Sequence, residues 1–186
     1  HAVADILFGD INPGGKLPVC FPRNGNHAPL YYARTLTHAP ESNPNYRSRY
    51  WDSPTTPLYP FGFGLSYTTF SFANLKLSSS QVKIGDSLGV SVDVTNTGKV
   101  AGDEVVQLYI HQKWGSDSRP MRELKGFERI TLQPGETKSV TFQLGPDELG
   151  YWSTNAGKWI QDVTSFDVWV GSDSLATLHA DLEVVD

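Results

Sequence analysis

Apolar and polar residues alternate along most of the second half of the chain. In the segment 87–97 every second side chain is apolar, at Leu88, Val90, Val92 and Val94. Because neighbouring side chains of a strand point to opposite faces, this pattern predicts a strand with one buried face. The same alternation marks the segments 72–77, 104–110, 122–132, 137–144, 165–170 and 177–185. The second half is therefore expected to consist of short strands joined by turns.

Gly and Pro residues between these segments support the same interpretation. Gly126 interrupts the alternation of 122–132, which predicts a β-bulge. Pro134 and Gly135 stand where a type II turn favours them. About seven such strands predict an all-β fold, a sandwich of the fibronectin type III or immunoglobulin-like class. Each fully buried Val or Leu contributes roughly 1.5–3 kcal/mol, so residues 66–186 are expected to fold by themselves.

The first residues of the chain follow a different pattern. Residues 2–8 predict a short helix with Val3, Ile6 and Leu7 on its apolar face. Residues 16–21 predict a short extended run, with Pro18 marking an edge or irregular strand. One helix and one strand cannot bury their apolar faces alone. This segment is therefore expected to pack on a partner outside the sequence, and the chain to be the C-terminal part of a longer protein.

Residues 22–60 show no helix or strand period and contain many prolines, which predicts a long linker. The linker is rich in aromatic residues: Tyr31, Tyr32, Tyr46, Tyr50, Trp51 and Tyr59. That composition is too aromatic for a solvated tether. The linker is therefore expected to lie against a neighbouring protein surface, buried along one side.

Charge and composition exclude several classes of partner. The net charge is −5, only 19% of residues are charged, and no basic block occurs, so neither nucleic acid nor an anionic membrane is an expected partner. No apolar run approaches the roughly 18–20 residues of a membrane span. The first residues lack a signal-peptide pattern, so any targeting signal is expected upstream. Cys20 cannot form an internal disulfide, and its apolar surroundings predict a buried, inert thiol.

The sequence contains few signs of catalytic or cofactor chemistry. Its five histidines fall at no metal-ligand spacing and a single cysteine excludes cysteine-based zinc patterns, so neither a metal nor a cofactor is expected. The glycine-rich stretch 62–66 lacks the third glycine and the lysine of a phosphate loop and is interpreted as a turn. No nucleophile elbow of the Gly-x-Ser-x-Gly type occurs.

Carboxylates are candidates for catalysis, because glycosidases need two of them facing one substrate. The adjacent pairs 103–104 and 147–148 flank strands beside turns and are expected to face water. Asp52 lies among aromatics, as it would in a sugar subsite, so Arg49, Trp51 and Asp52 are the substrate-binding candidates. The favoured interpretation is that Arg49 and Asp52 pair while Tyr50 and Trp51 pack on a neighbouring domain. No residue of this chain is expected to be catalytic.

Two aromatic residues, Tyr109 and Trp169, fall on the outward faces of their predicted strands. They would either form a sugar-binding platform or be covered by the linker or by a further domain, and the second interpretation is favoured. The candidates for interdomain packing are Tyr46, Tyr50, Trp51, Tyr59, Tyr109 and Trp169.

Three parts of the chain together resemble a known family. Residues 4–23 are similar to the segment that closes the α/β-sandwich domain of glycoside hydrolase family 3, the β-glucosidase family. Residues 46–52 and 57–70 resemble the junction into that family's third domain, and the pattern Tyr-x-Ser-Arg-Tyr at 46–50 favours the bacterial periplasmic type. Residues 119–142 resemble the hallmark of the family's fibronectin type III-like domain.

The resemblance implies a division of the chain. Residues 1–25 would be the remnant of the α/β-sandwich domain, 26–65 the linker, and 66–186 the fibronectin type III-like domain. It also implies a parent hydrolase that removes β-linked glucose from the non-reducing ends of its substrates and retains the configuration of the anomeric carbon. The nucleophile Asp of that family belongs to an N-terminal barrel and the acid/base Glu to the second domain. Neither motif occurs here, so the resemblance transfers a structural role and no catalytic residue.

The partners implied are the barrel and α/β domains of the same enzyme, with a β-linked oligosaccharide bound by the parent. The linker aromatics, where they are bared, are expected to promote a homodimer. Localisation is expected to be periplasmic or secreted. Two alternatives stay open, namely a carbohydrate-binding accessory module in place of a stability and interface region, and a β-xylosidase in place of a β-glucosidase parent.

Overall fold

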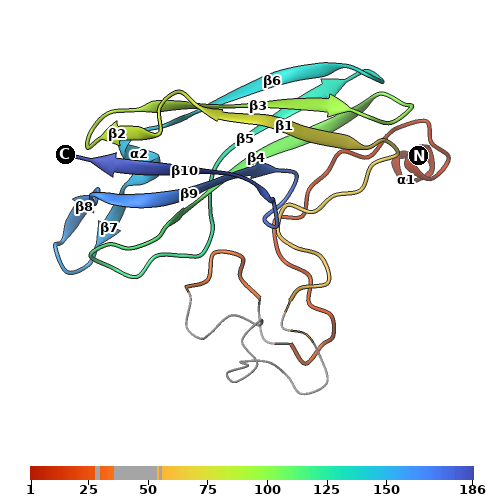
Figure 1. The fold of residues 1–186 in the computed structure, drawn as a ribbon. Helices are drawn as coiled ribbons and strands as arrows, with labels where there is room; N and C mark the ends of the chain where they lie inside the picture. The colour runs from red at the N-terminus through yellow and green to blue at the C-terminus, as the bar shows by residue number, and fades with distance from the viewer. Residues whose placement is uncertain (28–29, 36–53, 55) are drawn as a thin grey trace.

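The computed structural model describes residues 1–27, 30–35, 54 and 56–186. Two layers form a β-sandwich (Figure 1), and their neighbouring strands are antiparallel except for β2 and β10, which pair in parallel. The three-stranded sheet has the order β1-β3-β6, with β1 at Phe70–Leu77, β3 at Leu88–Asn96 and β6 at Thr137–Leu144. The five-stranded sheet has the order β2-β10-β9-β4-β5, with bounds Gln81–Lys83, Leu178–Val185, Thr164–Gly171, Gly102–Gln112 and Glu123–Leu132.

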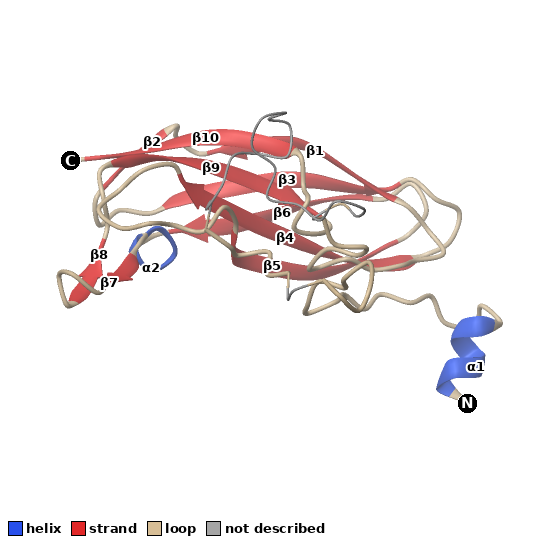
Figure 2. Ribbon diagram, turned by 90° about the horizontal axis from the view of Figure 1, so that it is seen from below, coloured by secondary structure: helices blue, strands red, loops and turns tan. Residues whose placement is uncertain are grey.

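Four short elements lie at the two ends of the sandwich. A hairpin of β7 (Tyr151–Ser153) and β8 (Lys158–Ile160) follows the one-turn helix α2 (Pro146–Leu149). These elements lie at the same end as the C-terminus, whereas α1 (Ala2–Leu7) lies at the opposite end (Figures 1 and 2). The two ends of the molecule can therefore meet different partners.

The core lies between the two sheets and consists mainly of the side chains that the alternation predicted, with Val82 of β2 and Leu149 of α2 added. Buried residues of β3, β4, β6, β9 and β10 form one cluster, which includes Leu88, Val90, Val92, Val94, Val106, Leu108, Ile110, Val140, Leu144, Phe166, Val168, Val170, Leu182 and Val184. The all-β sandwich prediction is thus confirmed. All the long strands were predicted, whereas β2, β7 and β8 were not, because three residues are too few to show a period.

The predicted bulge lies on β5 beside Gly126. Leu108 of β4 pairs with Gly126, but the next residue, Tyr109, pairs with Leu124, so Lys125 is the extra residue. A Cβ on Gly126 would lie 2.8 Å from a ring carbon of Phe142. Glycine therefore allows the close approach of the second sheet at the bulge.

The N-terminal segment runs antiparallel to the end of the linker instead of forming a full strand. Leu17 N donates to Phe63 O at 2.8 Å and Phe21 N donates to Tyr59 O at 2.9 Å. The only bridge assigned among these described residues joins Phe21 and Tyr59. Residues 16–21 are therefore extended, as the sequence predicted, but they form one bridge instead of a strand, because Pro18 removes a backbone donor from the middle of the run.

Candidate functional site

An ion pair joins the N-terminal segment to the sandwich. Lys16 Nζ lies 2.7 Å from Glu104 Oε1 of β4, and the two side chains are only 15% and 6% exposed. Burial raises the pKa of the Glu104 carboxyl, although the Lys16 ammonium acts in the opposite direction. A charge left here without its partner would be strongly destabilising, so the pair fixes the position of the segment on the sheet.

Asn12 makes a second connection at the same place. Its Nδ2 donates to Ala101 O at 2.9 Å, just before β4. Its Oδ1 accepts from Ser66 Oγ at 3.0 Å and from Tyr67 N at 2.8 Å. One side chain therefore links the N-terminal segment to the two residues that follow the linker and to the residue that precedes β4. We call this contact region around Asn12, Lys16 and Glu104 the seam.

Two glycines allow the linker to approach the seam closely. A Cβ on Gly64 would collide with the carbonyl oxygen of Gly15. Gly62 has φ of 81°, and a Cβ there would collide with the side chain of Gln107. A positive φ strains any residue with a side chain. The stretch 62–66 thus begins in a turn, as the sequence predicted, and it packs against protein.

Tyr109 is fully buried although it lies on the outward face of β4. The ring of Tyr32 meets it edge-on at 6.0 Å, and Tyr32 stacks on Phe61 at 4.1 Å. The Tyr109 hydroxyl donates to Gln107 Oε1, and Gln107 Nε2 donates to Ser172 O at 2.6 Å. Burial raises the pKa of the Tyr109 hydroxyl. Linker aromatics therefore cover the sheet here.

The other predicted site residues are only partly described. Arg49, Asp52, Tyr46, Tyr50 and Trp51 all lie outside the described residues. Their assigned roles, in substrate binding or interdomain packing, stay predictions.

Two packing candidates besides Tyr109 are described. Tyr59 stacks on Phe63 at 4.8 Å between ring centroids and keeps an exposed edge. Trp169 is half-buried beneath the Arg122 guanidinium, which lies 3.9 Å from the centre of its ring. Their contacts to further domains remain predictions. Cys20, expected to be buried, is only half-buried.

The acidic pair Asp103 and Glu104 does not face water as expected. Glu104 is buried in the seam, because it shares the inward face of β4 with Val106. Asp103 points to the other face, where hydrogen bonds from Thr131 and Arg129 lower its pKa. Neighbouring residues of a strand point in opposite directions, so these carboxylates cannot act together on one substrate.

In the second pair, the Glu148 carboxylate is engaged at the start of α2. Glu148 Oε2 accepts from Gly145 N at 2.9 Å. This contact caps the one-turn helix, while the neighbouring Asp147 is exposed. A carboxylate held by a capping hydrogen bond has a structural role.

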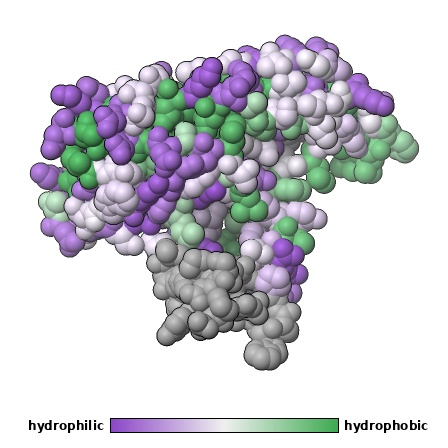
Figure 3. All heavy atoms as spheres, in the orientation of Figure 1, coloured by the Kyte–Doolittle hydropathy of each residue, from purple (hydrophilic) through white to green (hydrophobic). Residues whose placement is uncertain are grey.

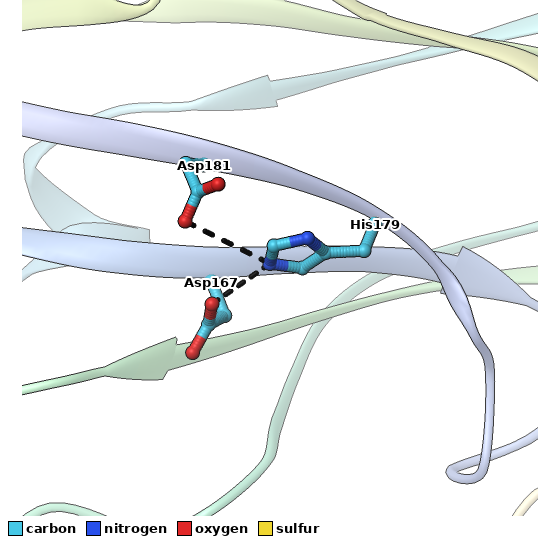
Figure 4. Close-up of side chains that lie close together, drawn as sticks. All are labelled: Asp167, His179 and Asp181. Carbon is cyan, nitrogen blue, oxygen red and sulfur yellow. Dashed lines mark hydrogen bonds and ion pairs between the residues drawn. The ribbon is translucent and has the colours of Figure 1, made fainter.

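A cluster of Asp167, His179 and Asp181 lies on β9 and β10 (Figure 4). Their ligand atoms all lie within 4.8 Å of one another. Sequence spacing gave no metal pattern for His179, because the three residues meet only through the pairing of Asp167 with Asp181. The expectation that no metal binds stays a prediction at this cluster.

Lys113 pairs with both carboxylates of this cluster. Its Nζ lies 3.0 Å from Asp167 Oδ1 and 2.8 Å from Asp181 Oδ1. The hydrogen bond from Lys113 lowers the pKa of Asp181. A general acid of a glycosidase needs a raised pKa instead. The cluster is therefore interpreted as an ion-pair network across the sheet.

An exposed apolar surface surrounds α1. Its members are Val3, Ile6, Leu7, Phe8, Ile11 and Leu65. Figure 3 shows apolar atoms gathered at the end of the molecule where α1 lies. An open groove of about 650 Å³ continues this surface, lined by Leu17, Phe21, Tyr59 and Phe63 among others. Exposed apolar surfaces of this kind mark interaction sites. We call it the α1 surface.

Within the described residues, no helix combines the length and the apolar character needed to cross a bilayer.

Two family models match the chain. The model described as Glycosyl hydrolase family 3 C-terminal domain matches residues 1–67, and the model described as Fibronectin type III-like domain matches residues 104–174. The matches follow each other in the order that the sequence motifs indicated. The seam thus connects a segment within the first match to a strand within the second.

Known proteins of the same kind match nearly the whole chain. It is 44% identical over 188 residues to the periplasmic beta-glucosidase of Salmonella typhimurium, covering 100% of the chain and 24% of that protein. It is 47% identical to a beta-xylosidase of Formosa agariphila, covering 94% of the chain and 24% of that protein. The chain thus spans about a quarter of the length of these relatives.

Solved structures agree with this assignment. A beta-glucosidase from Listeria innocua, in complex with glucose, superposes with a TM-score of 0.90 at 37% identity, over 99% of this chain and 26% of that one. A β-glucosidase from Erythrobacter marinus superposes with a TM-score of 0.89 at 42% identity, over 100% of this chain and 23% of that one. The chain therefore belongs to glycoside hydrolase family 3, as a C-terminal part that includes the fibronectin type III-like domain.

Proposed function

We propose that the chain is the non-catalytic C-terminal stability and interface region of an exo-acting β-glucosidase that hydrolyses β-glucosides with retention. The α1 surface is the observation that carries this proposal. Its apolar side chains have no covering within the described residues, although the segment matches the C-terminal domain of the family. The α/β and barrel domains of the same enzyme are the partners proposed for this surface.

The seam explains how such an interface would act on the whole enzyme. A buried ion pair and the three hydrogen bonds of Asn12 hold the N-terminal segment on the sandwich. Because the segment and the sandwich are held together, domains that bind to α1 would also stabilise the position of the sandwich. In this arrangement the fibronectin type III-like domain stabilises the interface without contacting the reacting atoms.

Several carboxylates of the described residues are paired with lysines, which supports a role without catalysis. Glu104 is held in the seam by Lys16, and the Lys113 ammonium bridges Asp167 and Asp181. A retaining glycosidase needs two carboxyl groups about 5–5.5 Å apart across the scissile bond, one of them free to protonate the leaving group. Pairing with lysine favours the ionised carboxylate, which is not free to protonate a leaving group.

The relatives support two substrate classes for the parent enzyme. The Salmonella protein is named a periplasmic beta-glucosidase and the Formosa protein a beta-xylosidase. We propose a β-glucosidase, with a β-xylosidase as the alternative parent. The periplasm or the medium is the proposed location, after the Salmonella relative. A homodimer formed through the linker aromatics is proposed only where the other domains are missing.

The chain by itself is expected not to hydrolyse an aryl β-glucoside or an aryl β-xyloside above the buffer rate, because positioned carboxylates cannot be replaced by loose surface acids. The measurement is the release of the aryl group at high protein concentration. The control is the D52N variant, purified identically, because Asp52 was the one carboxylate with a sugar-subsite pattern. Turnover that disappears in D52N would contradict the proposal, whereas turnover equal in both preparations identifies a contaminating enzyme.

A further inference from the structure

Two tryptophans lie side by side on the β7–β8 hairpin. Trp152 pairs directly with Trp159 across the hairpin. Directly opposite residues share one face of a sheet, with Cβ atoms about 4.5–5.5 Å apart. The two side chains are 55% and 65% exposed, whereas Tyr151 and Ser153 on the other face of β7 are buried. The hairpin therefore presents two indoles together on its solvent face.

Contacts on the buried side hold the hairpin in place. The Tyr151 hydroxyl donates to Asp162 Oδ2 at 2.7 Å, and the Arg119 guanidinium lies 4.2 Å from the centre of the Tyr151 ring. Asn155 Nδ2, in the hairpin turn, donates to Asp117 Oδ1 at 3.0 Å. A hairpin fixed in this way loses little conformational freedom when a ligand binds to the indoles.

Position and area both disfavour a protein partner for the two indoles. The hairpin lies at the end of the sandwich opposite α1, so it does not continue the α1 surface (Figure 1). The exposed parts of two tryptophans amount to roughly 300 Å², well below the about 800 Å² that each partner buries in a stable interface. The turn between them contributes the uncharged polar residues Thr154 and Asn155. A small flat ligand with hydroxyl groups fits this surface better than a second protein.

We propose that Trp152 and Trp159 form a binding surface for a β-linked oligosaccharide. Pyranose rings with equatorial substituents expose flat C–H faces, and these faces pack on the electron-rich faces of indole rings. The hydroxyl groups of the sugar stay at the rim, where the exposed Thr154 hydroxyl can hydrogen-bond to them. The choice of a β-linked glycan rests on the proposed function, whereas the site itself rests on the hairpin.

The test is a titration of the 186-residue chain with cellohexaose, xylohexaose and the α-linked maltohexaose. Binding is measured by calorimetry and by tryptophan fluorescence. The chain is expected to bind one or both β-linked oligosaccharides and to bind maltohexaose more weakly. The W152A/W159A variant is expected to lose affinity by about tenfold or more, a loss consistent with stacking on two aromatic rings. The W152Y/W159Y variant keeps aromatic faces and should retain most of the affinity.

The matched control is Phe127→Ala, which removes another aromatic residue, 69% exposed, from β5. Its affinity should equal that of the unaltered chain, and circular dichroism should show each variant folded. Three results would overturn the proposal. The chain could bind neither β-linked oligosaccharide, W152A/W159A could bind them as tightly as the unaltered chain, or the unaltered chain could form a dimer that W152A/W159A does not form. None of these results would give the chain glycosidase activity, so failure here is distinguishable from failure of the proposed function.

Discussion

Replacing Tyr109 with alanine is expected to lower the free energy of unfolding of the chain by about 3–5 kcal/mol, the range for large aromatic residues removed from a packed site. The ring is fully buried and meets the linker residue Tyr32, which in turn stacks on Phe61. Its removal leaves a cavity there and deprives Gln107 Oε1 of its donor. Urea denaturation followed by circular dichroism measures the change.

The control for this substitution is Tyr109→Phe, which keeps the ring and removes only the hydroxyl. It should reduce the free energy of unfolding by about 1 kcal/mol, the usual effect of one hydrogen bond. If Tyr109→Ala were no more harmful than Tyr109→Phe, the linker aromatics would not be holding the sheet in the way the contacts indicate.

Replacing Lys16 with methionine is expected to reduce stability at pH 7 by about 3 kcal/mol, because it leaves the Glu104 carboxylate buried without its partner. The E104L/K16M double variant should recover much of the loss, since apolar residues that replace a buried ion pair are often neutral. The matched control is Lys83→Met, which removes an exposed lysine from β2 and should change stability little.

The loss caused by Lys16→Met should also depend on pH. Burial already raises the pKa of Glu104 in the folded chain, and removal of Lys16 raises it further. A carboxyl with a raised folded pKa contributes stability below its unfolded pKa of about 4.3, and this contribution is lost as pH rises through the folded value. The deficit of the variant should therefore shrink as pH falls from 7 toward 4.5. A deficit that stays constant over this range would contradict the assignment of the buried charge.

The long strands could be predicted because their alternation extends over many residues. Val90, Val92 and Val94 establish a period that no helix would show. The β7–β8 hairpin could not be predicted, because three residues on each side are too few for a period. Its paired tryptophans, Trp152 and Trp159, become a surface only when the register places them opposite each other.

The seam was missed although the sequence carried a signal for part of it. Glu104 has the same parity as Val106 and Leu108, so the alternation itself placed it on the inward face. Its position beside a turn favoured a solvent-exposed side chain instead. The partner, Lys16, lies in a turn-rich segment without any period, and nothing in the sequence pairs the two residues. The α1 surface, by contrast, could be predicted in part, because the sequence shows one short amphipathic helix and no element that would bury its apolar face.

The most direct test of the interface proposal uses the Salmonella periplasmic beta-glucosidase, to which the chain is 44% identical. Two versions would be compared with the unaltered enzyme: one lacking the matched region, and one carrying this chain in its place. The deletion version is expected to be insoluble or inactive, and the exchange version to hydrolyse an aryl β-glucoside with a kcat of the same order as the unaltered enzyme. A deletion version with unchanged kcat and unchanged Tm would contradict the proposed role.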